Sequence, residues 1–359
     1  TEPMTHIINT VLESGQFPTM WKRAEITPLN KVKSPQTFKQ LRPISLLFHL
    51  GKVTESVLSA LIKRELPQLD DQYAYTKQRS TTDALVKFAT DITYNLDNKS
   101  TIAVQALLID FSKAFDRMLP DHAVRKLLNL GISPPLVQVV KSFFTERQQR
   151  VKYTDVCSEY QDCKIGVPQG TIMGPLLWNV FVDDLKPDTQ CIKYADDTTV
   201  YNVIKKSEVD ITHSTTYHAT ISFDRNPLQT AASYTSVWCN DNSMLLNASK
   251  SQAVTFTLQK SITYNPITVN DTVIEDAPIA KLLGVKFDSH MKFSSHVDAI
   301  IEKARPAVHA IIQLKKIGVS SKSLTRFYQS RVLSIIAYAA PSWFPYLSNT
   351  DKDKLERLQ

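Results

Sequence analysis

The sequence lacks the patterns that mark membrane, secreted and zinc-dependent proteins. No apolar run approaches the roughly 18 residues that a membrane-spanning helix needs, and the first residues do not resemble a signal peptide. The four cysteines have neither zinc-ribbon spacing nor a Cys-x-x-Cys pair, and the eight histidines form no metalloprotease motif. These absences argue against zinc sites and predict free thiols, an intracellular location and no membrane partner.

Glycine is also scarce, and its placement is informative. Only eight glycines occur in 359 residues, and three of them fall within residues 166–174, Gly-Val-Pro-Gln-Gly-Thr-Ile-Met-Gly. Glycine allows positive φ and close approach of another backbone, and this segment leads into the apolar run 175–181, which predicts a helix. The segment is either a loop against which a nucleotide stacks or a tight loop–helix junction and nothing more.

Basic residues are concentrated toward the two ends of the chain. Residues 1–65 contain nine Lys and Arg against five Asp and Glu, residues 286–359 contain twelve against six, and the remainder contains 21 against 24. Such a distribution suits a polyanion gripped by both ends, because phosphate neutralisation supplies most sequence-independent affinity for nucleic acids. Solvated lysines on helix surfaces would give the same composition, so charge alone only favours nucleic-acid binding.

Three carboxylates follow or interrupt apolar runs with strand character. The run 192–200, Ile-Lys-Tyr-Ala-Asp-Asp-Thr-Thr-Val, predicts a hairpin with Asp196 and Asp197 at its turn, since side chains alternate along a strand and both can serve one site only at a turn. The run 103–109 predicts a buried strand that ends at Asp110. Like charges about 4 Å apart repel by about 4 kcal/mol at an effective dielectric of 20, so such a cluster predicts a divalent-metal site.

Periodicity and turn residues predict a mixed chain without linkers or repeats. Further strands are expected at residues 24–29, 41–47 and 149–153, the first two flanking a basic turn at 30–35. Helices are expected at residues 4–13, 51–65, 120–131, from 133 toward 147, from 296 onward with a kink or interruption at Pro306, and from about 321.

Seven short blocks occur along the chain. They are Leu-Arg-Pro-Ile-Ser-Leu-Leu at 41, Gln-Arg-Ser-Thr-Thr-Asp-Ala-Leu at 78, Asp-Phe-Ser-Lys-Ala-Phe-Asp at 110, Gly-Val-Pro-Gln-Gly at 166, Tyr-Ala-Asp-Asp at 194, Trp238 with Asn-Ser-Met-Leu-Leu-Asn-Ala-Ser-Lys at 242, and Lys-Leu-Leu-Gly-Val-Lys-Phe-Asp at 281. In type and order these blocks resemble those of the reverse transcriptases of non-long-terminal-repeat (LINE-type) retrotransposons, over nearly all of the chain. One block alone would be weak; seven in order are specific. Compared with that family the stretch 205–226 is longer than usual, and a polar surface insertion is expected there.

The resemblance implies an α+β, right-hand polymerase fold. Fingers are expected at residues 1–100, and an antiparallel-sheet palm at 101–290 with fingers segments interleaved near 120–165. A helical thumb is expected at 291–359 and, because its pattern stops in mid-helix, is expected to be truncated.

The resemblance also assigns site residues by position. Asp110, Asp196 and Asp197 match the catalytic carboxylates and, with the backbone carbonyl of Phe111, the ligands of two Mg²⁺ ions, for which Mn²⁺ is an expected substitute. Phe115 matches the aromatic residue that leaves no room for a 2′-hydroxyl. The full set of dNTP-binding matches is Lys31 (with Lys33 as its possible replacement), Arg42, Phe115, Gln169, Gly170 and Lys250.

Lys250 is matched to a lysine that protonates pyrophosphate, although a solvent-facing charge at a helix end fits equally well. The residues matched to primer or template contacts, for some of which a solvated basic face is the alternative, are Tyr194, Leu283, Gly284, Arg147 and Arg150.

The implied function is RNA-directed DNA polymerisation in retrotransposition, in which a primer 3′-hydroxyl is extended with dNTPs on an RNA template by two-metal nucleotidyl transfer. Expected partners are the RNA template, the DNA primer and dNTPs, with an endonuclease domain in another part of the same open reading frame and nuclear action during integration. The alternatives are a catalytically silent nucleic-acid-binding descendant and an RNA-templated RNA polymerase, which should lack the sugar-excluding Phe115.

Overall fold

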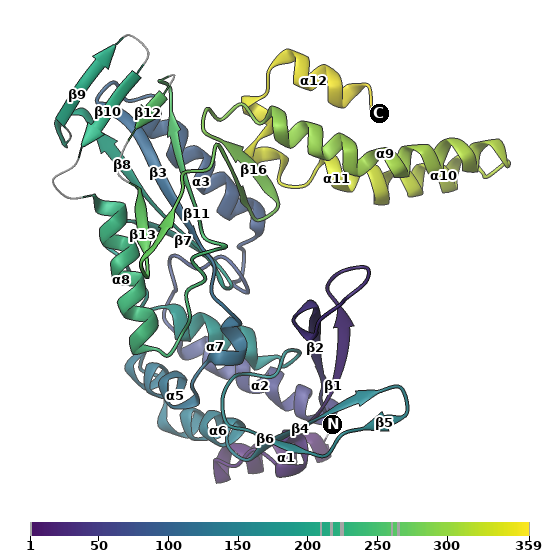
Figure 1. The fold of residues 1–359 in the computed structure, drawn as a ribbon. Coiled ribbons are helices and arrows are strands. Elements are labelled where there is room, and N and C mark those ends of the chain that lie inside the picture. Colours follow the sequence, from purple (N-terminus) through teal and green to yellow (C-terminus); the bar gives the residue numbers. More distant parts are fainter. Residues whose placement is uncertain are drawn as a thin grey trace. The chain divides into compact units, whose positions relative to one another are not determined.

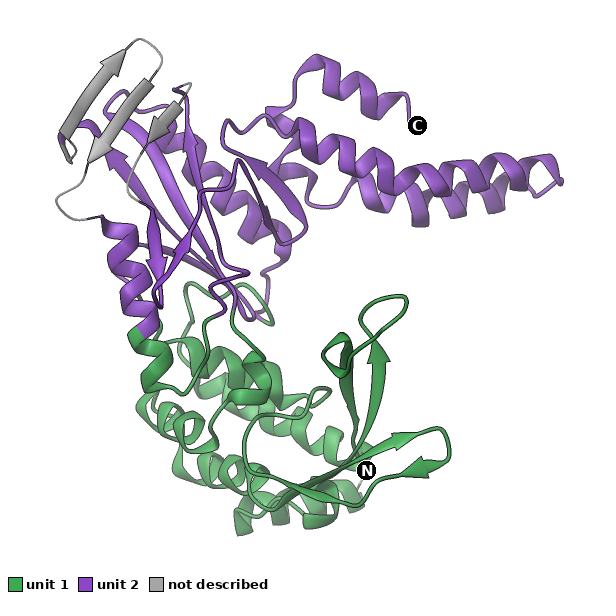
Figure 2. Ribbon diagram, in the orientation of Figure 1, with its two compact units in different colours: residues 1–75, 111–186, 237–246 green, residues 76–110, 187–236, 247–359 purple. Residues whose placement is uncertain are grey.

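The computed structural model describes residues 2–208, 210–215, 218–222, 226–259, 261–263 and 266–358. Helices and antiparallel sheets are mixed along the chain, which confirms the predicted α+β class (Figure 1). The chain forms two compact units: residues 1–75, 111–186 and 237–246 make unit 1, and residues 76–110, 187–236 and 247–359 make unit 2 (Figure 2). The division into fingers, palm and thumb is not tested by these units and stays a prediction.

Unit 1 combines helices with a five-stranded sheet. Strand β1 (Arg23–Asn30) pairs antiparallel with β2 (Leu41–Leu46) and parallel with β4 (Arg147–Tyr153). Two short strands, β5 (Val156–Cys157) and β6 (Gln161–Cys163), both pair with β4. The helices of this unit are α1 (Glu2–Ser14), α2 (His49–Glu65), α4 (Ala114–Arg117), α5 (Pro120–Asn129), α6 (Pro134–Phe144) and α7 (Met173–Val182).

Helix α7 is the buried centre of unit 1. Nine of its ten residues are buried, in keeping with an apolar sequence that has no polar face. Its one buried side-chain amide is half satisfied: Asn179 Nδ2 donates to the Ala74 carbonyl at 2.8 Å, whereas its Oδ1 has no partner among the described residues. At its start, the buried Glu55 carboxylate accepts from the backbone amides of Ile172 (2.6 Å) and Met173 (3.1 Å). This acid supplies acceptors for amides that have no partner within the helix.

Unit 2 is built on a four-stranded antiparallel sheet in the order β11-β3-β8-β7. Its strands are β3 (Thr101–Ile109), β7 (Gln190–Tyr194), β8 (Asp197–Lys205) and β11 (Gln252–Thr257). Helix α3 (Thr81–Leu96) packs on this sheet through Phe88, whose ring lies 5.3 Å from that of Tyr201 and 5.8 Å from that of Phe256. The aromatic core between α3 and the sheet therefore packs against β8, the strand that begins with Asp197, and against β11.

The remaining elements of unit 2 are hairpins and helices. The strands are β9 (Asp210–Thr215), β10 (His218–Ser222), β12 (Ser261–Thr263), β13 (Ile267–Val269), β14 (Thr272–Ile274), β15 (Ile279–Leu282) and β16 (Val285–Asp288). The helices are α9 (Ser294–Lys316), α10 (Ser321–Tyr328), the π-helix η4 (Gln329–Leu333), α11 (Ser334–Ile336) and α12 (Asn349–Glu356). Helix α8 (Pro227–Asp241) extends across the boundary between the units.

Helix α9 continues through Pro306. Of the predicted kink or interruption, the interruption is therefore wrong and the kink stays a prediction. The proline removes one amide donor, and the rest of the helix persists. Of the predicted surface insertion at 205–226, residues 205–207 are exposed and Asn226 is half-buried, and the side chains of residues 208–225 lie outside the described part. No helix in the described part of the chain is both long and apolar enough to cross a bilayer.

Candidate active site

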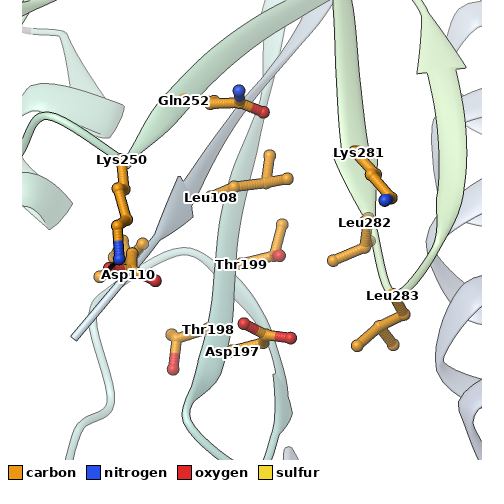
Figure 3. Close-up of a pocket in the computed structure, with 11 residues that line it drawn as sticks. Leu108, Asp110, Asp197, Thr198, Thr199, Lys250, Gln252, Lys281, Leu282 and Leu283 are labelled. Carbon is orange, nitrogen blue, oxygen red and sulfur yellow. Dashed lines mark ion pairs between the residues drawn. The ribbon is translucent and has the colours of Figure 1, made fainter. Parts of the chain in front are cut away.

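Adjacent strand ends bring Asp110 and Asp197 to one cavity in unit 2. Strands β3 and β8 are antiparallel with Ile109 opposite Thr198, so the residue after β3 and the first residue of β8 lie side by side. The cavity has a volume of about 160 Å³ (Figure 3). It is lined by Leu108, Ile109, Asp110, Asp197, Thr198, Thr199, Lys250, Gln252, Lys281, Leu282 and Leu283.

Asp196 lies in the turn between β7 and β8. Tyr194 pairs with Asp197 across this hairpin, which leaves Ala195 and Asp196 as a two-residue loop. Ala195 has a φ of 55°, a left-handed conformation that few residues other than glycine adopt and that often occurs at functional sites. The prediction that both aspartates occupy the turn is right for Asp196 only, because two residues suffice to close the hairpin and Asp197 already belongs to β8.

The loop before β11 holds Asp110 in place. Asn247 donates its backbone amide to the Asp110 carbonyl at 2.8 Å and its side-chain amide to Asp110 Oδ2 at 3.0 Å. Lys250 Nζ lies 3.9 Å from the same Oδ2, and Figure 3 shows the lysine reaching toward that carboxylate. The Lys250 side chain is 70% exposed, so the ion pair contributes little stability, about 0–1 kcal/mol.

The three carboxylates repel one another. Burial, and then the negative charges of Asp196 and Asp110, raise the pKa of Asp197 to about 6. The Asp197 side chain is exposed at the cavity, so solvent screens part of this effect. Burial also raises the pKa of Asp196, and the charge of Asp110 acts in the same direction. Ionising all three groups is therefore unfavourable without a nearby cation.

This charge distribution fits a divalent cation. Within the described residues no three His, Cys, Asp or Glu side chains already form a metal-holding cluster. The oxygens of Asp110, Asp196 and Asp197 are nevertheless the hard ligands that such ions prefer, and a cation would relieve the repulsion that raises the pKa values. The predicted contribution of the Phe111 carbonyl stays a prediction.

The turn between β15 and β16 forms another wall of the cavity. Its two residues both have positive φ, 45° at Leu283 and 90° at Gly284, the combination that a type I′ hairpin turn requires. Leu283 lines the cavity, as do Lys281 and Leu282 on β15. Tyr194, also matched to primer contacts, is half-buried at the end of β7.

Sequence reasoning did not single out Asn247, Gln252 or Lys281 as site residues. All three lie within or beside recognised blocks, so a signal was available for their neighbourhood. Their orientation depends on strand register, which pairs Gln252 with Leu108 and directs Lys281 to the cavity. Neither register follows from the order of the blocks.

The predicted triphosphate ligands lie on the β1–β2 hairpin of unit 1. Lys31 follows β1, and its backbone amide donates to the Gln40 carbonyl at 2.9 Å; Arg42 is on β2 opposite Leu29. Both side chains are exposed, as is that of Lys33. None of the three makes an ion pair with any residue that the structure describes. Their charges are thus available to an anionic ligand.

The glycine-containing segment is a tight junction in unit 1. Gly170 has a φ of 117°, and a Cβ there would lie 2.9 Å from the Ser45 carbonyl oxygen, so the position needs glycine. Gln169 donates its side-chain amide to Asp116 Oδ1 at 3.2 Å, and the Phe115 ring lies 5.2 Å from that of Trp178. The loop–helix junction is confirmed, and stacking of a nucleotide stays a prediction.

The two arginines matched to template contacts have different environments. Arg147 is 3% exposed; its guanidinium packs 4.6 Å from the Phe143 ring and donates to the Phe143 carbonyl at 3.1 Å. A charge enclosed in this way is not presented to a phosphate, so the structure gives Arg147 a core role instead of the predicted one. Arg150 pairs with Glu25, with Nε at 3.0 Å, and remains partly accessible.

Comparison with known proteins identifies the family of this chain. Residues 30–287 match the reverse transcriptase (RNA-dependent DNA polymerase) family. The chain is 30% identical over 309 residues to the RNA-directed DNA polymerase from mobile element jockey of Drosophila melanogaster, covering 84% of this chain and 33% of that protein. It is 26% identical over 347 residues to the probable RNA-directed DNA polymerase from transposon BS of the same species, covering 94% and 37%. The chain thus spans about a third of the length of these relatives.

Solved structures show the same fold. Apo telomerase from Candida tropicalis, truncated from its C-terminal domain, superposes with a TM-score of 0.51 at 10% identity over 79% of this chain and 57% of that chain. Telomerase from Candida albicans gives a TM-score of 0.50 at 10% identity over 98% and 65%. Together with the mobile-element relatives, the family match confirms the resemblance to LINE-type enzymes: this chain belongs to the reverse transcriptase family.

Proposed function

We propose that this chain extends a primer 3′-hydroxyl with dNTPs on an RNA template, as part of retrotransposition. The observation that carries the proposal is the trio of mutually repelling carboxylates, in which the pKa of Asp197 is raised to about 6 by burial and by its two acidic neighbours. A site that repels its own charges is suited to cations, and cation-dependent nucleotidyl transfer is the chemistry that such sites support.

Divalent metal ions are general in this family, and we propose two Mg²⁺ ions held by Asp110, Asp196 and Asp197, with Mn²⁺ as a substitute. When bound, such ions make the primer hydroxyl more acidic and stabilise charge on the leaving pyrophosphate. Asn247 keeps the Asp110 carboxylate oriented through its 3.0 Å hydrogen bond, and the hairpin turn fixes Asp196 beside it. Few protein ligands are needed because substrate phosphates complete the coordination.

Lys250 is positioned to compensate charge at the same site. Its ammonium lies 3.9 Å from Asp110 Oδ2, and its side chain is 70% exposed, so this weak ion pair leaves the ammonium accessible to a phosphate. We assign it to the pyrophosphate, to which it can donate a proton as the phosphoryl bond breaks. Its closeness to Asp110 favours this role over that of a solvent-facing charge.

Nucleotide binding is assigned to exposed cations and to one aromatic ring. Lys31 and Arg42 are exposed and make no ion pair with a described residue, and their donors suit a triphosphate, Arg42 through its forked guanidinium. Phe115 is backed by Trp178 at 5.2 Å, which restricts the motion of its ring. A ring held in this way is suited to exclude a 2′-hydroxyl and so to select deoxynucleotides.

Primer extension tests the proposal. The intact chain should extend a DNA primer annealed to RNA when Mg²⁺ and dNTPs are supplied, and Asp196→Asn should reduce the rate at least about a hundredfold. Asp188→Asn is the matched control, because Asp188 is an exposed acid outside the cavity, just before β7, the strand that leads to Asp196. Binding of primer–template without extension by the intact chain would instead favour the silent alternative, which no present observation supports.

A further inference from the structure

The turn between β15 and β16 is held by a side chain that belongs to none of the recognised blocks. Tyr338, which follows α11, donates its hydroxyl to the Leu283 carbonyl at 2.7 Å. Its ring also covers the next residue, since a Cβ at Gly284 would lie 3.4 Å from Tyr338 Cε1. Among the described residues, Tyr338 alone offers a side-chain hydrogen bond to this turn.

The turn needs such support because its backbone is unfavourable. Leu283 has a φ of 45°, and a branched side chain in the left-handed region costs conformational energy that surrounding contacts must offset. Leu283 is also a wall of the cavity that contains Asp110 and Asp197. A shift of this turn would therefore change the shape of the space beside the carboxylates.

Tyr338 is itself fixed from behind. Trp343, which is fully buried, donates its indole N–H to the Tyr338 carbonyl at 3.0 Å. The His296 ring, on α9, packs edge-on against Trp343 with centroids 5.2 Å apart. The base of the α9 helix is thus connected through a buried tryptophan and a half-exposed tyrosine to the edge of the cavity.

We propose that Tyr338 is a positioning residue that holds the Leu283–Gly284 turn in the conformation needed to align a primer terminus with the aspartates. The inference rests on the proposed polymerase function. Tyr338 does not contact the reacting atoms in this proposal and acts through the turn that it holds. Small displacements of an element that positions the substrate produce large changes in rate.

The test compares Tyr338→Phe with the parent chain. The variant keeps the ring and removes only the hydroxyl, so folding should be preserved. We expect hydrogen–deuterium exchange at residues 283–285 to accelerate about fivefold, because the loss of one hydrogen bond changes an equilibrium or a rate by about this factor. For the same reason the single-turnover rate of nucleotide addition should fall about fivefold, while primer–template affinity stays unchanged. Tyr94→Phe, at a 78% exposed tyrosine on α3, is the matched control and should change neither quantity.

The outcomes separate the two proposals. Unchanged exchange at the turn in Tyr338→Phe would overturn the positioning role, whether or not the chain polymerises. Faster exchange with an unchanged rate of addition would also overturn it, because the turn would then be irrelevant to alignment. A parent chain that binds primer–template but adds no nucleotide would contradict the proposed function, and the exchange measurement would still decide whether Tyr338 holds the turn.

Discussion

At the residue scale, the unusual feature of this chain is a set of acids arranged against electrostatic preference. Asp110 and Asp197 lie beside each other across two strands, and Asp196 occupies a turn whose first residue has a positive φ. Lys250 is the one nearby cation paired with this group in the described part of the chain, and its pairing is loose at 3.9 Å. Electrostatic repulsion is thus built into the fold and is available for coupling to cation binding.

The pH dependence of stability follows from Asp197. Its carboxyl titrates at about 6 in the folded chain, whereas an unfolded aspartate titrates near about 3.9. Between these values the folded chain binds more protons than the unfolded chain, so the free energy of unfolding falls as pH rises through this window. In EDTA at pH 7, Asp197→Asn should therefore have a Tm about 1–3 °C above that of the parent, after allowing for solvent screening.

Thermal unfolding between pH 4 and pH 8 checks this expectation. The difference in Tm between Asp197→Asn and the parent should be largest above pH 6 and should disappear near pH 4. Adding Mg²⁺ at pH 7 should raise the Tm of the parent more than that of the variant, because the ion stabilises the state that binds it. A difference that does not change with pH would show that the Asp197 charge is not destabilising.

Sugar selection is a second property that belongs to one residue. Phe115→Val removes the ring but leaves an apolar side chain beside Trp178. We expect incorporation of ribonucleotides relative to deoxynucleotides to increase about 10- to 100-fold, since a steric exclusion of this kind is worth a few kcal/mol. Single-nucleotide addition with matched dNTP and NTP pairs measures the ratio. Equal discrimination in both proteins would remove Phe115 from the selection of the sugar.

At the element scale, α7 shows how a buried helix in unit 1 is started. Glu55 on α2 provides the acceptor for two amides at its beginning, and burial raises the pKa of this carboxyl even though both hydrogen bonds oppose the shift. Glu55→Ala would leave both amides without this partner, that of Met173 in a buried place and that of Ile172 in a partly buried one. We expect it to lower the free energy of unfolding by about 2–4 kcal/mol.

Chemical denaturation of Glu55→Ala and Glu55→Gln separates acceptor from charge. Glutamine keeps one carbonyl oxygen that can accept from Ile172 and Met173, so its loss of stability should be about half that of alanine or less. Equal losses would indicate that the negative charge near the helix start, and not the hydrogen bonds, stabilises α7.

At the scale of the whole molecule, much of the fold was predictable because its elements carry local signals. Prolines at 120 and 134 mark the first turns of α5 and α6, and the apolar run before Asp110 is the central strand β3. The apolar runs also placed Asp110 at the end of a strand and Asp196 and Asp197 at a hairpin turn, and the resemblance added their catalytic role. The outcome for Arg147 could not be predicted, because its burial against Phe143 depends on tertiary packing that a charge count does not contain.

The site was predictable in its acids and in the lining residues Lys250 and Leu283, but not in the rest of its lining. Asp110 and Asp197 share a cavity because β3 and β8 pair with Ile109 opposite Thr198. The sequence blocks alone do not predict this register; the resemblance to the family does no more than imply that the two acids meet. Lys281 lines the cavity from the β15–β16 hairpin, and Tyr338, which follows α11, contacts the turn of that hairpin at the edge of the cavity. Both residues lie far along the chain from Asp110. Contacts of this kind depend on tertiary structure, and no local pattern encodes them.

The most direct measurement is Mg²⁺-dependent, single-turnover extension of a DNA primer on an RNA template by the parent chain and by Asp110→Asn. Asparagine keeps the size of the side chain and removes the charge that, with Asp196 and Asp197, makes the cavity attractive to cations. The predicted result is extension by the parent and at least about a hundredfold slower extension by the variant, with primer–template affinity unchanged. Extension by Asp110→Asn at a rate close to that of the parent would contradict the account.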